Sequence, residues 1–153
     1  MSTISARTLV FGATLILAVA WLTAPSAQPA RSYVNPRTPA NSTAPPFSSA
    51  VLTGDTLYLS GTLGLANGQR PDTPEEEARN ALTNVQNMLK GAGMTMDDLV
   101  TVQVFCSDVA FYDAFNSVYR TFFTQEFPAR AFIGSGRLLN NARFEVQGIA
   151  VRR

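Results

Sequence analysis

Histidine is absent from this sequence of 153 residues, and cysteine occurs once. The absence of histidine excludes Ser-His-Asp and Cys-His catalysis, histidine metal sites and histidine-based pH switching. A single cysteine, Cys106, excludes a disulfide within the chain and a cysteine cluster for zinc. Carboxylates and guanidinium groups are therefore the first candidates for chemistry.

Charge is also scarce, since 15% of the residues are charged and the net charge is +1. Arg7 is the only charged side chain in the first 27 residues, so the rest of the chain has 11 basic and 11 acidic residues. A neutral chain without a basic run gives no electrostatic argument for binding nucleic acid or an anionic membrane surface. The length and the hydrophobic content of 46% fit one domain with a packed core.

Residues 1–27 have the pattern of a secretory signal peptide. Arg7 is followed by an apolar run from Thr8 to Leu22 and then by the small-residue segment TAPSAQPA. The run is shorter than the roughly twenty residues of a membrane span. We expect export to the periplasm or the medium, with a retained membrane anchor or a buried helix as the alternatives. A lone cysteine suits an oxidising compartment, because no second thiol can mispair with it.

Residues 28–46 contain five prolines and predict a linker or an irregular lead-in. The segment SYVN within it is compatible with a short edge strand. The folded domain is expected over residues 47–153. It begins with two β-rich runs on either side of TGD, a pattern that predicts a hairpin.

Two amphipathic segments, residues 73–93 and 108–125, predict helices. In the first, Thr73 is a candidate N-cap, Pro74 suits the first turn, and Glu76 completes a capping-box pattern. The consecutive glutamates EEE are expected to stabilise the helix, because negative charges interact favourably with the positive end of the helix dipole. Their side chains diverge by about 100° per residue, so they do not easily converge on a metal or a substrate. The second segment has a broad aromatic band, which is typical of a helix packed on a sheet.

Strands are predicted around residues 100–106, 130–134 and 144–151. In the first of them, alternation places four residues on one buried face: Val100, Val102, Val104 and Cys106. The order of two or three strands, helix, strand, helix and two strands indicates an α+β fold, a mixed β-sheet with two helices packed on one face.

Arg130 and Glu145 are the strongest candidates for chemistry. Arg130 follows Pro128 at the entrance of a predicted strand, and a guanidinium can hold a carboxylate through two parallel hydrogen bonds. Glu145 is a lone acid in ARFEVQGIAV, where it could orient or deprotonate a water molecule. The residues alone leave two alternatives open, an internal Arg130–Glu145 salt bridge or two solvated strand ends.

The segments FPARAFIGSGRL and FEVQGIAVRR resemble the carboxyl-terminal signature of the Rid family, also called the YjgF/YER057c/UK114 family. Matches at LYLSGTLGL, at GAG with the following DLV, and at VYRTFF extend the resemblance over about residues 32–153. The resemblance implies a chorismate-mutase-like α+β fold and a homotrimer with pockets between its subunits. It also implies hydrolysis of reactive 2-imino acids to 2-keto acids and ammonia, without cofactor or metal.

The resemblance assigns roles to single residues. Arg130 would bind the substrate carboxylate, and Glu145 would position the water that attacks the imine carbon. At two further substrate-binding positions the sequence departs from the family pattern, because Phe47 replaces the usual tyrosine and Phe132 the usual cysteine. Thr62 also stands where glutamine is common.

Three hypotheses follow. The first is an exported 2-imino acid deaminase. The second is a non-catalytic module that binds a small carboxylate through the same arginine. The third, a ribonuclease or translation inhibitor, is disfavoured by the neutral charge, the missing histidine and the leader.

Overall fold

The computed structural model describes residues 30–34 and 45–153, so the predicted leader and most of the proline-rich lead-in lie outside the described residues. Within the described part, none of the helices has the length and apolar character needed to cross a membrane. The elements follow in the order β1 (Arg31–Val34), β2 (Ala50–Thr53), β3 (Thr56–Leu63), α1 (Pro74–Gly91), β4 (Leu99–Cys106), α2 (Tyr112–Tyr119), β5 (Ala129–Gly134) and β6 (Phe144–Val151).

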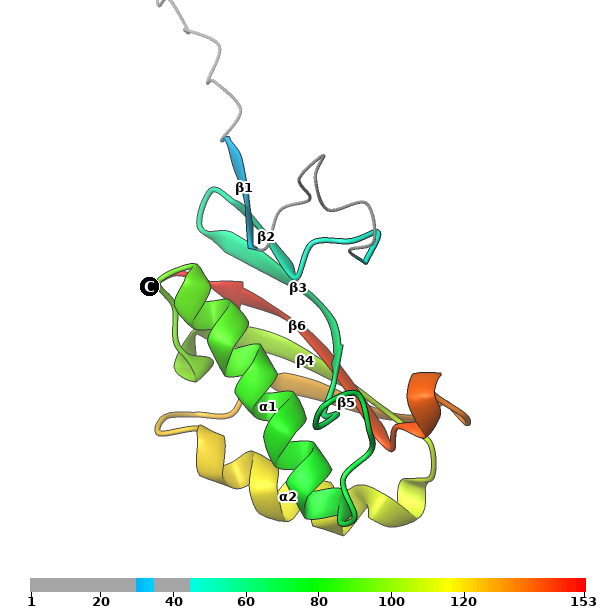
Figure 1. The fold of residues 1–153 in the computed structure, drawn as a ribbon. Helices are drawn as coiled ribbons and strands as arrows, with labels where there is room; N and C mark the ends of the chain where they lie inside the picture. Colours follow the sequence, from blue (N-terminus) through cyan, green and yellow to red (C-terminus); the bar gives the residue numbers. More distant parts are fainter. Residues whose placement is uncertain (1–29, 35–44) are drawn as a thin grey trace, which may run out of the picture.

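The strands form one mixed sheet with the order β1-β2-β3-β6-β4-β5. Neighbouring strands are antiparallel except β4 and β5, which are parallel. Figure 1 shows α1 and α2 lying across one face of this sheet. The α+β prediction, with two helices on one face of a mixed sheet, is confirmed.

The core lies between the helices and the sheet. One side of α1 faces the sheet, because its apolar residues recur at helical spacing. The fully or almost fully buried side chains include Leu57, Leu82, Leu89, Val104, Phe115, Phe144 and Val146. Residues that alternate with the buried ones in β4 and β6 point to the opposite face, which no helix covers in the described chain.

Two features of the structure differ from the prediction, the exposure of Val100 and the length of the second helix. Val100 is 47% exposed, contrary to its predicted place on the buried face, because the pairing of β4 with β6 shifts between Leu99 and Thr101. The second predicted helix is reduced to α2 with short 3₁₀ turns on both sides, Val109–Phe111 and Arg120–Phe122. The edge strand expected at SYVN is present as β1.

Thr73 caps α1 as predicted, since its Oγ1 accepts a hydrogen bond from the N–H of Glu76 at 3.2 Å. We expect Thr73→Ala to lower the free energy of unfolding by about 1 kcal/mol, because that helix N–H loses its partner. Urea denaturation measures the change. Thr83→Ala, at an exposed position inside the same helix, is the matched control and is expected to leave stability unchanged or raise it by up to about 0.7 kcal/mol, because alanine has the higher helix propensity. Equal losses in both variants would contradict the capping role.

Candidate functional site

Arg130 lies on β5, one of the two edge strands of the sheet, and its side chain is on the face that the helices cover. Its guanidinium carbon is 4.5 Å from the centre of the Tyr119 ring, and the rings of Phe132 and Tyr112 lie at 5.8 and 6.0 Å. Aromatic faces attract a guanidinium without neutralising its charge, and they leave its N–H edges available.

Arg130 has no acidic partner within the described part of the chain, where the ion pairs are Glu77–Arg143 and Asp98–Arg153. The internal Arg130–Glu145 salt bridge, one of the two alternatives left open by the sequence, is therefore not found there. A half-buried guanidinium without a counter-ion is suited to bind an anion from outside the chain.

A pocket of about 210 Å³ adjoins this guanidinium, lined by Asn116, Tyr119, Arg120, Phe127, Pro128 and Arg130. The volume is below the roughly 300–1,000 Å³ of pockets for drug-sized ligands, so the pocket fits a small molecule. The combination of two cations, Arg120 and Arg130, an amide and aromatic walls favours a small carboxylate with an apolar or lightly polar body.

Asn116, Tyr119 and Arg120 are residues of this pocket that the sequence did not single out, and the first two lie on α2. Asn116 and Tyr119 stand three positions apart, a spacing that places both side chains on the helix face toward β5. Burial raises the pKa of Tyr119 to about 12, although the nearby Arg130 acts in the opposite direction. The phenol is therefore neutral near pH 7, and the positive charge of the pocket is not offset by a phenolate.

Phe132, a predicted substrate-binding residue, lies beside Arg130 but points into the aromatic cluster. Its ring makes edge contacts with Tyr112 at 5.0 Å and Phe115 at 5.7 Å between ring centres. Phe132 thus supports the guanidinium from the side of the core.

Glu145 lies on β6 and points to the face of the sheet opposite to Arg130, because its neighbours Phe144 and Val146 are buried under the helices. Its carboxylate lies directly over Gly61 of β3, where an added Cβ would overlap with Oε1. Glycine at position 61 is thus what leaves room for this carboxylate. Glu145 also lines an open pocket of about 430 Å³ with residues of the loop 137–140.

Phe47 belongs to the same end of the molecule as Glu145. The carbonyl of the next residue, Ser48, accepts a hydrogen bond of 2.7 Å from the Ser60 hydroxyl, so this segment runs beside β3 just before Gly61. The Phe47 side chain is 60% exposed. An exposed aromatic ring in the segment beside β3 is available to contact a ligand or another chain.

The predicted site residues therefore form two separate groups in one chain. Arg130 and Phe132 are on β5, whereas Phe47 and Glu145 are near β3 and β6, and β4 lies between β5 and β6. Arg130 and Glu145 also lie on opposite faces of the sheet. A substrate bound at Arg130 cannot reach Glu145 of the same chain through the sheet.

Comparisons with known proteins agree with this fold. A family model described as endoribonuclease L-PSP matches residues 37–152. A relative from Capra hircus, named 2-iminobutanoate/2-iminopropanoate deaminase, is 41% identical over 110 residues, which cover 70% of this chain and 80% of the relative. A relative of the same name from Homo sapiens is 34% identical over 110 residues, with the same coverage of 70% and 80%.

Solved structures share the fold. The YjgF gene product from E. coli has 32% sequence identity and a TM-score of 0.68, and the match covers 71% of this chain and 89% of that one. E. coli TdcF with bound serine has 28% identity and a TM-score of 0.69, with coverage of 72% and 91%. With the family model matching most of the chain, this protein belongs to the endoribonuclease L-PSP family, the YjgF/UK114 or Rid family that its carboxyl-terminal sequence resembles.

Proposed function

We propose that this protein hydrolyses reactive 2-imino acids to 2-keto acids and ammonia. The observation that carries the proposal is Arg130, a cation that has no acidic partner among the described residues and that lies in a small pocket with aromatic walls. The names of the relatives support the reaction class. The serine held by TdcF supports the ligand class, because an amino acid has the same carboxylate as a 2-imino acid.

Arg130 binds the substrate carboxylate with two parallel N–H bonds, which fix the position of the neighbouring imine carbon. The side chain of Asn116 is buried at the same pocket and can bond to a further polar atom of the ligand. The aromatic walls lower the local polarity and strengthen the attraction between guanidinium and carboxylate.

Glu145 acts as the general base. It takes a proton from water while the water oxygen bonds to the imine carbon and the C=N electron pair moves to nitrogen, which takes a proton from the solvent. Glu145 then returns its proton to the nitrogen of this carbinolamine. Collapse forms the C=O bond, breaks the C–N bond, releases ammonia and passes the hydroxyl proton to the solvent. The sum is one imine and one water consumed, and one keto acid and one ammonia formed.

The two groups act on one substrate when they come from different copies of the chain. Since Arg130 and Glu145 lie on opposite faces of one sheet, we propose a homotrimer in which Arg130 of one subunit and Glu145 of the next share a pocket. A head-to-tail interface repeated around a threefold axis uses each group once and closes into a ring. The edge position of β5 supports this arrangement, because Arg130 is at a border of the sheet that another chain can reach.

The test is release of 2-oxobutanoate from freshly generated 2-iminobutanoate. We expect a rate clearly above that of buffer for the wild-type protein, a large loss for Arg130→Ala, and an unchanged rate for Arg79→Ala, which removes an exposed arginine of α1. A wild-type rate equal to that of buffer would refute the deaminase.

A non-catalytic carboxylate-binding module is the second candidate, favoured by the absence of a hydroxyl at Phe47. It predicts saturable binding of 2-oxobutanoate that Arg130→Ala abolishes, together with no turnover by the wild type. Calorimetry and the turnover assay on the same preparation separate the two candidates. A ribonuclease is not proposed, since the chain offers neither histidine nor a basic surface run.

Export remains our proposal for the location of the protein, and it rests on the leader pattern of residues 1–27. Sequencing the amino terminus of the mature protein tests it. We expect a terminus after the small-residue segment near Ala27. An intact Met1 in a soluble cytoplasmic fraction would contradict export.

Gly61→Ala is expected to lower kcat by about tenfold or more, because the new methyl group displaces the Glu145 carboxylate from its place over β3. The melting temperature is expected to change little, since the displaced atoms are the end of a flexible side chain. In a Glu145→Gln background the same substitution should cause no further loss of rate. Independent, additive losses would argue against this contact.

A further inference from the structure

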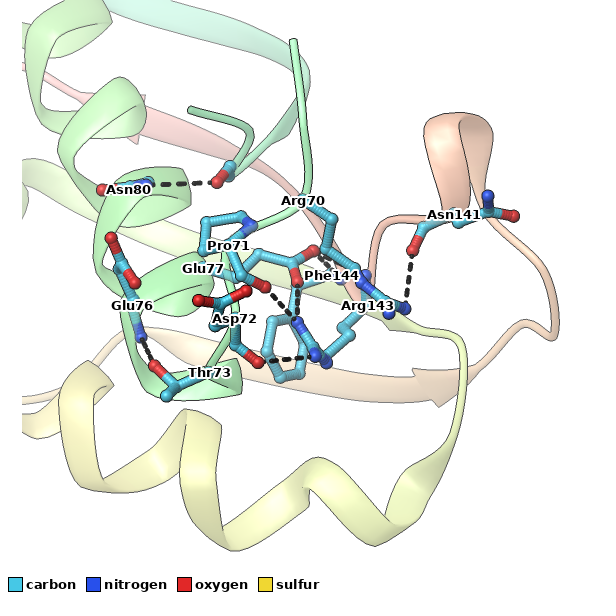
Figure 2. Close-up of polar contacts among 11 residues, drawn as sticks. Arg70, Pro71, Asp72, Thr73, Glu76, Glu77, Asn80, Asn141, Arg143 and Phe144 are labelled. Atoms are coloured by element: carbon cyan, nitrogen blue, oxygen red, sulfur yellow. Dashed lines mark hydrogen bonds and ion pairs between the residues drawn. The ribbon is translucent and has the colours of Figure 1, made fainter. Parts of the chain in front are cut away.

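Among the described residues, one ion pair is buried between α1 and the start of β6. Glu77 is fully buried and Arg143 is 8% exposed, and Arg143 Nη1 lies 2.9 Å from Glu77 Oε2. Figure 2 shows the two side chains facing each other, with the loop before α1 packed around them. The Arg143 guanidinium carbon also lies 5.5 Å from the ring centre of Phe111.

Most hydrogen bonds of this pair go to the backbone. Glu77 Oε1 accepts from the N–H groups of Arg143 and Phe144, at 2.5 and 3.2 Å. The guanidinium of Arg143 donates to the carbonyls of Pro71 and Asp72, at 2.9 and 3.0 Å. The pair thus joins the first turn of α1, the loop that precedes it and the first residues of β6.

Two asparagines on the same side of α1 hold the end of β3. Asn80 Nδ2 donates to the carbonyl of Gly64 at 3.3 Å, and Asn84 Nδ2 donates to the carbonyl of Leu63 at 3.0 Å. Glu77, Asn80 and Asn84 are spaced by three and four positions, so they form one stripe along the helix. Helix α1 therefore holds the ends of both strands through this stripe.

Glu145 lies where these two ends meet. It directly follows Phe144, whose N–H donates to Glu77. It also pairs across the sheet with Leu63, whose carbonyl accepts a hydrogen bond from Asn84. We propose that Glu77, Asn80 and Asn84 are positioning residues that hold Glu145 in register over Gly61. This inference rests on the proposed function and adds to it the residues that place the base.

The energetics agree with a positioning role. Burying two charges has a desolvation cost that their attraction often only offsets, so such a pair is weak evidence for added stability. Its hydrogen bonds to two backbone segments, residues 71–72 and 143–144, however, fix one geometry among the alternatives that an apolar core would allow. Because the stripe does not touch the Arg130 pocket, it should affect kcat and leave the binding of the substrate carboxylate unchanged.

The test compares Glu77→Gln and Asn84→Ala with Val85→Ala, a control that removes buried apolar atoms from the same helix without a bond to either strand end. At a temperature where all variants are folded, we expect kcat to fall about tenfold or more in Glu77→Gln and severalfold in Asn84→Ala, with KM within about twofold of wild type. Val85→Ala should keep the wild-type kcat even if its Tm falls as much as the Tm of Glu77→Gln or Asn84→Ala. Unchanged kcat in the stripe variants, or equal losses in the control, would overturn the inference.

Two further measurements keep the inference testable. If Glu77→Gln does not fold, Asn80→Ala and Asn84→Ala decide the outcome by the same criteria. If the wild type has no deaminase activity, the proposed function fails, and NMR of protein labelled at the glutamate carboxyl carbons tests the positioning without turnover. The Glu145 resonance, assigned with Glu145→Gln, should shift or broaden in Asn84→Ala but not in Val85→Ala. An unshifted resonance in Asn84→Ala would overturn the inference.

Discussion

Replacing Glu145 with glutamine is expected to lower kcat by about 10²- to 10⁴-fold, while KM stays within a few fold of wild type. Glutamine keeps the shape of the side chain and its place over Gly61, but its amide cannot take a proton from water. The remaining rate should come from substrate binding and from the reactivity of the imine itself. Steady-state release of 2-oxobutanoate measures both constants.

The matched control for this variant is Glu75→Gln, which removes an exposed carboxylate from the first turn of α1. It should keep the wild-type kcat and reduce stability only slightly, through the weaker interaction with the helix dipole. A Glu145→Gln protein that retains more than about a third of the wild-type kcat would exclude Glu145 as the general base, given the expected range.

Arg130→Ala is expected to reduce kcat/KM by about 10²-fold or more, because two charge-assisted hydrogen bonds to the carboxylate are lost. Inhibition by the product 2-oxobutanoate should weaken by a similar factor, since the keto acid has the same carboxylate. Arg130→Lys should recover only part of the loss, because an ammonium group lacks the planar fork and stacks less well on Tyr119.

Comparing kcat/KM with the inhibition constant of 2-oxobutanoate separates a loss of carboxylate binding from a loss of folded protein in Arg130→Ala. A destabilised but correctly built protein would lose active enzyme and keep the wild-type inhibition constant. An inhibition constant that is unchanged in Arg130→Ala would contradict the carboxylate-binding role, whatever the effect on kcat.

The fold could be predicted from local patterns because each helix and strand has its own signal. Thr73, Pro74 and the apolar stripe define α1, and alternation defines β4 and β6. The bulge that exposes Val100 was not predictable, because it arises from the pairing of β4 with β6, and that pairing depends on residues far apart in the chain. The carboxyl-terminal segments could be matched to their family from sequence, but the match does not show strand order.

The candidate site was only partly predictable for the same reason. Alternation alone could assign Arg130 and Glu145 to faces of their own strands, but the insertion of β4 between β5 and β6 decides that they lie apart. Asn116 was hidden within an aromatic helix pattern. The pattern EEE predicted the same role for Glu77 as for the exposed Glu75 and Glu76, a charge that stabilises the start of the helix. Its burial against Arg143 was not predictable, because Arg143 is 66 positions away in the sequence.

The placement of Arg130 and Glu145 makes the central claim directly testable by mixing two inactive proteins. In the homotrimer that we propose, co-expression of Arg130→Ala and Glu145→Gln chains should yield mixed assemblies in which some pockets combine an intact Arg130 from one subunit with an intact Glu145 from the next. For random assembly of equal amounts, we predict recovery of about a quarter of the wild-type activity toward 2-iminobutanoate. Activity no higher than that of either variant alone would contradict a pocket shared between subunits.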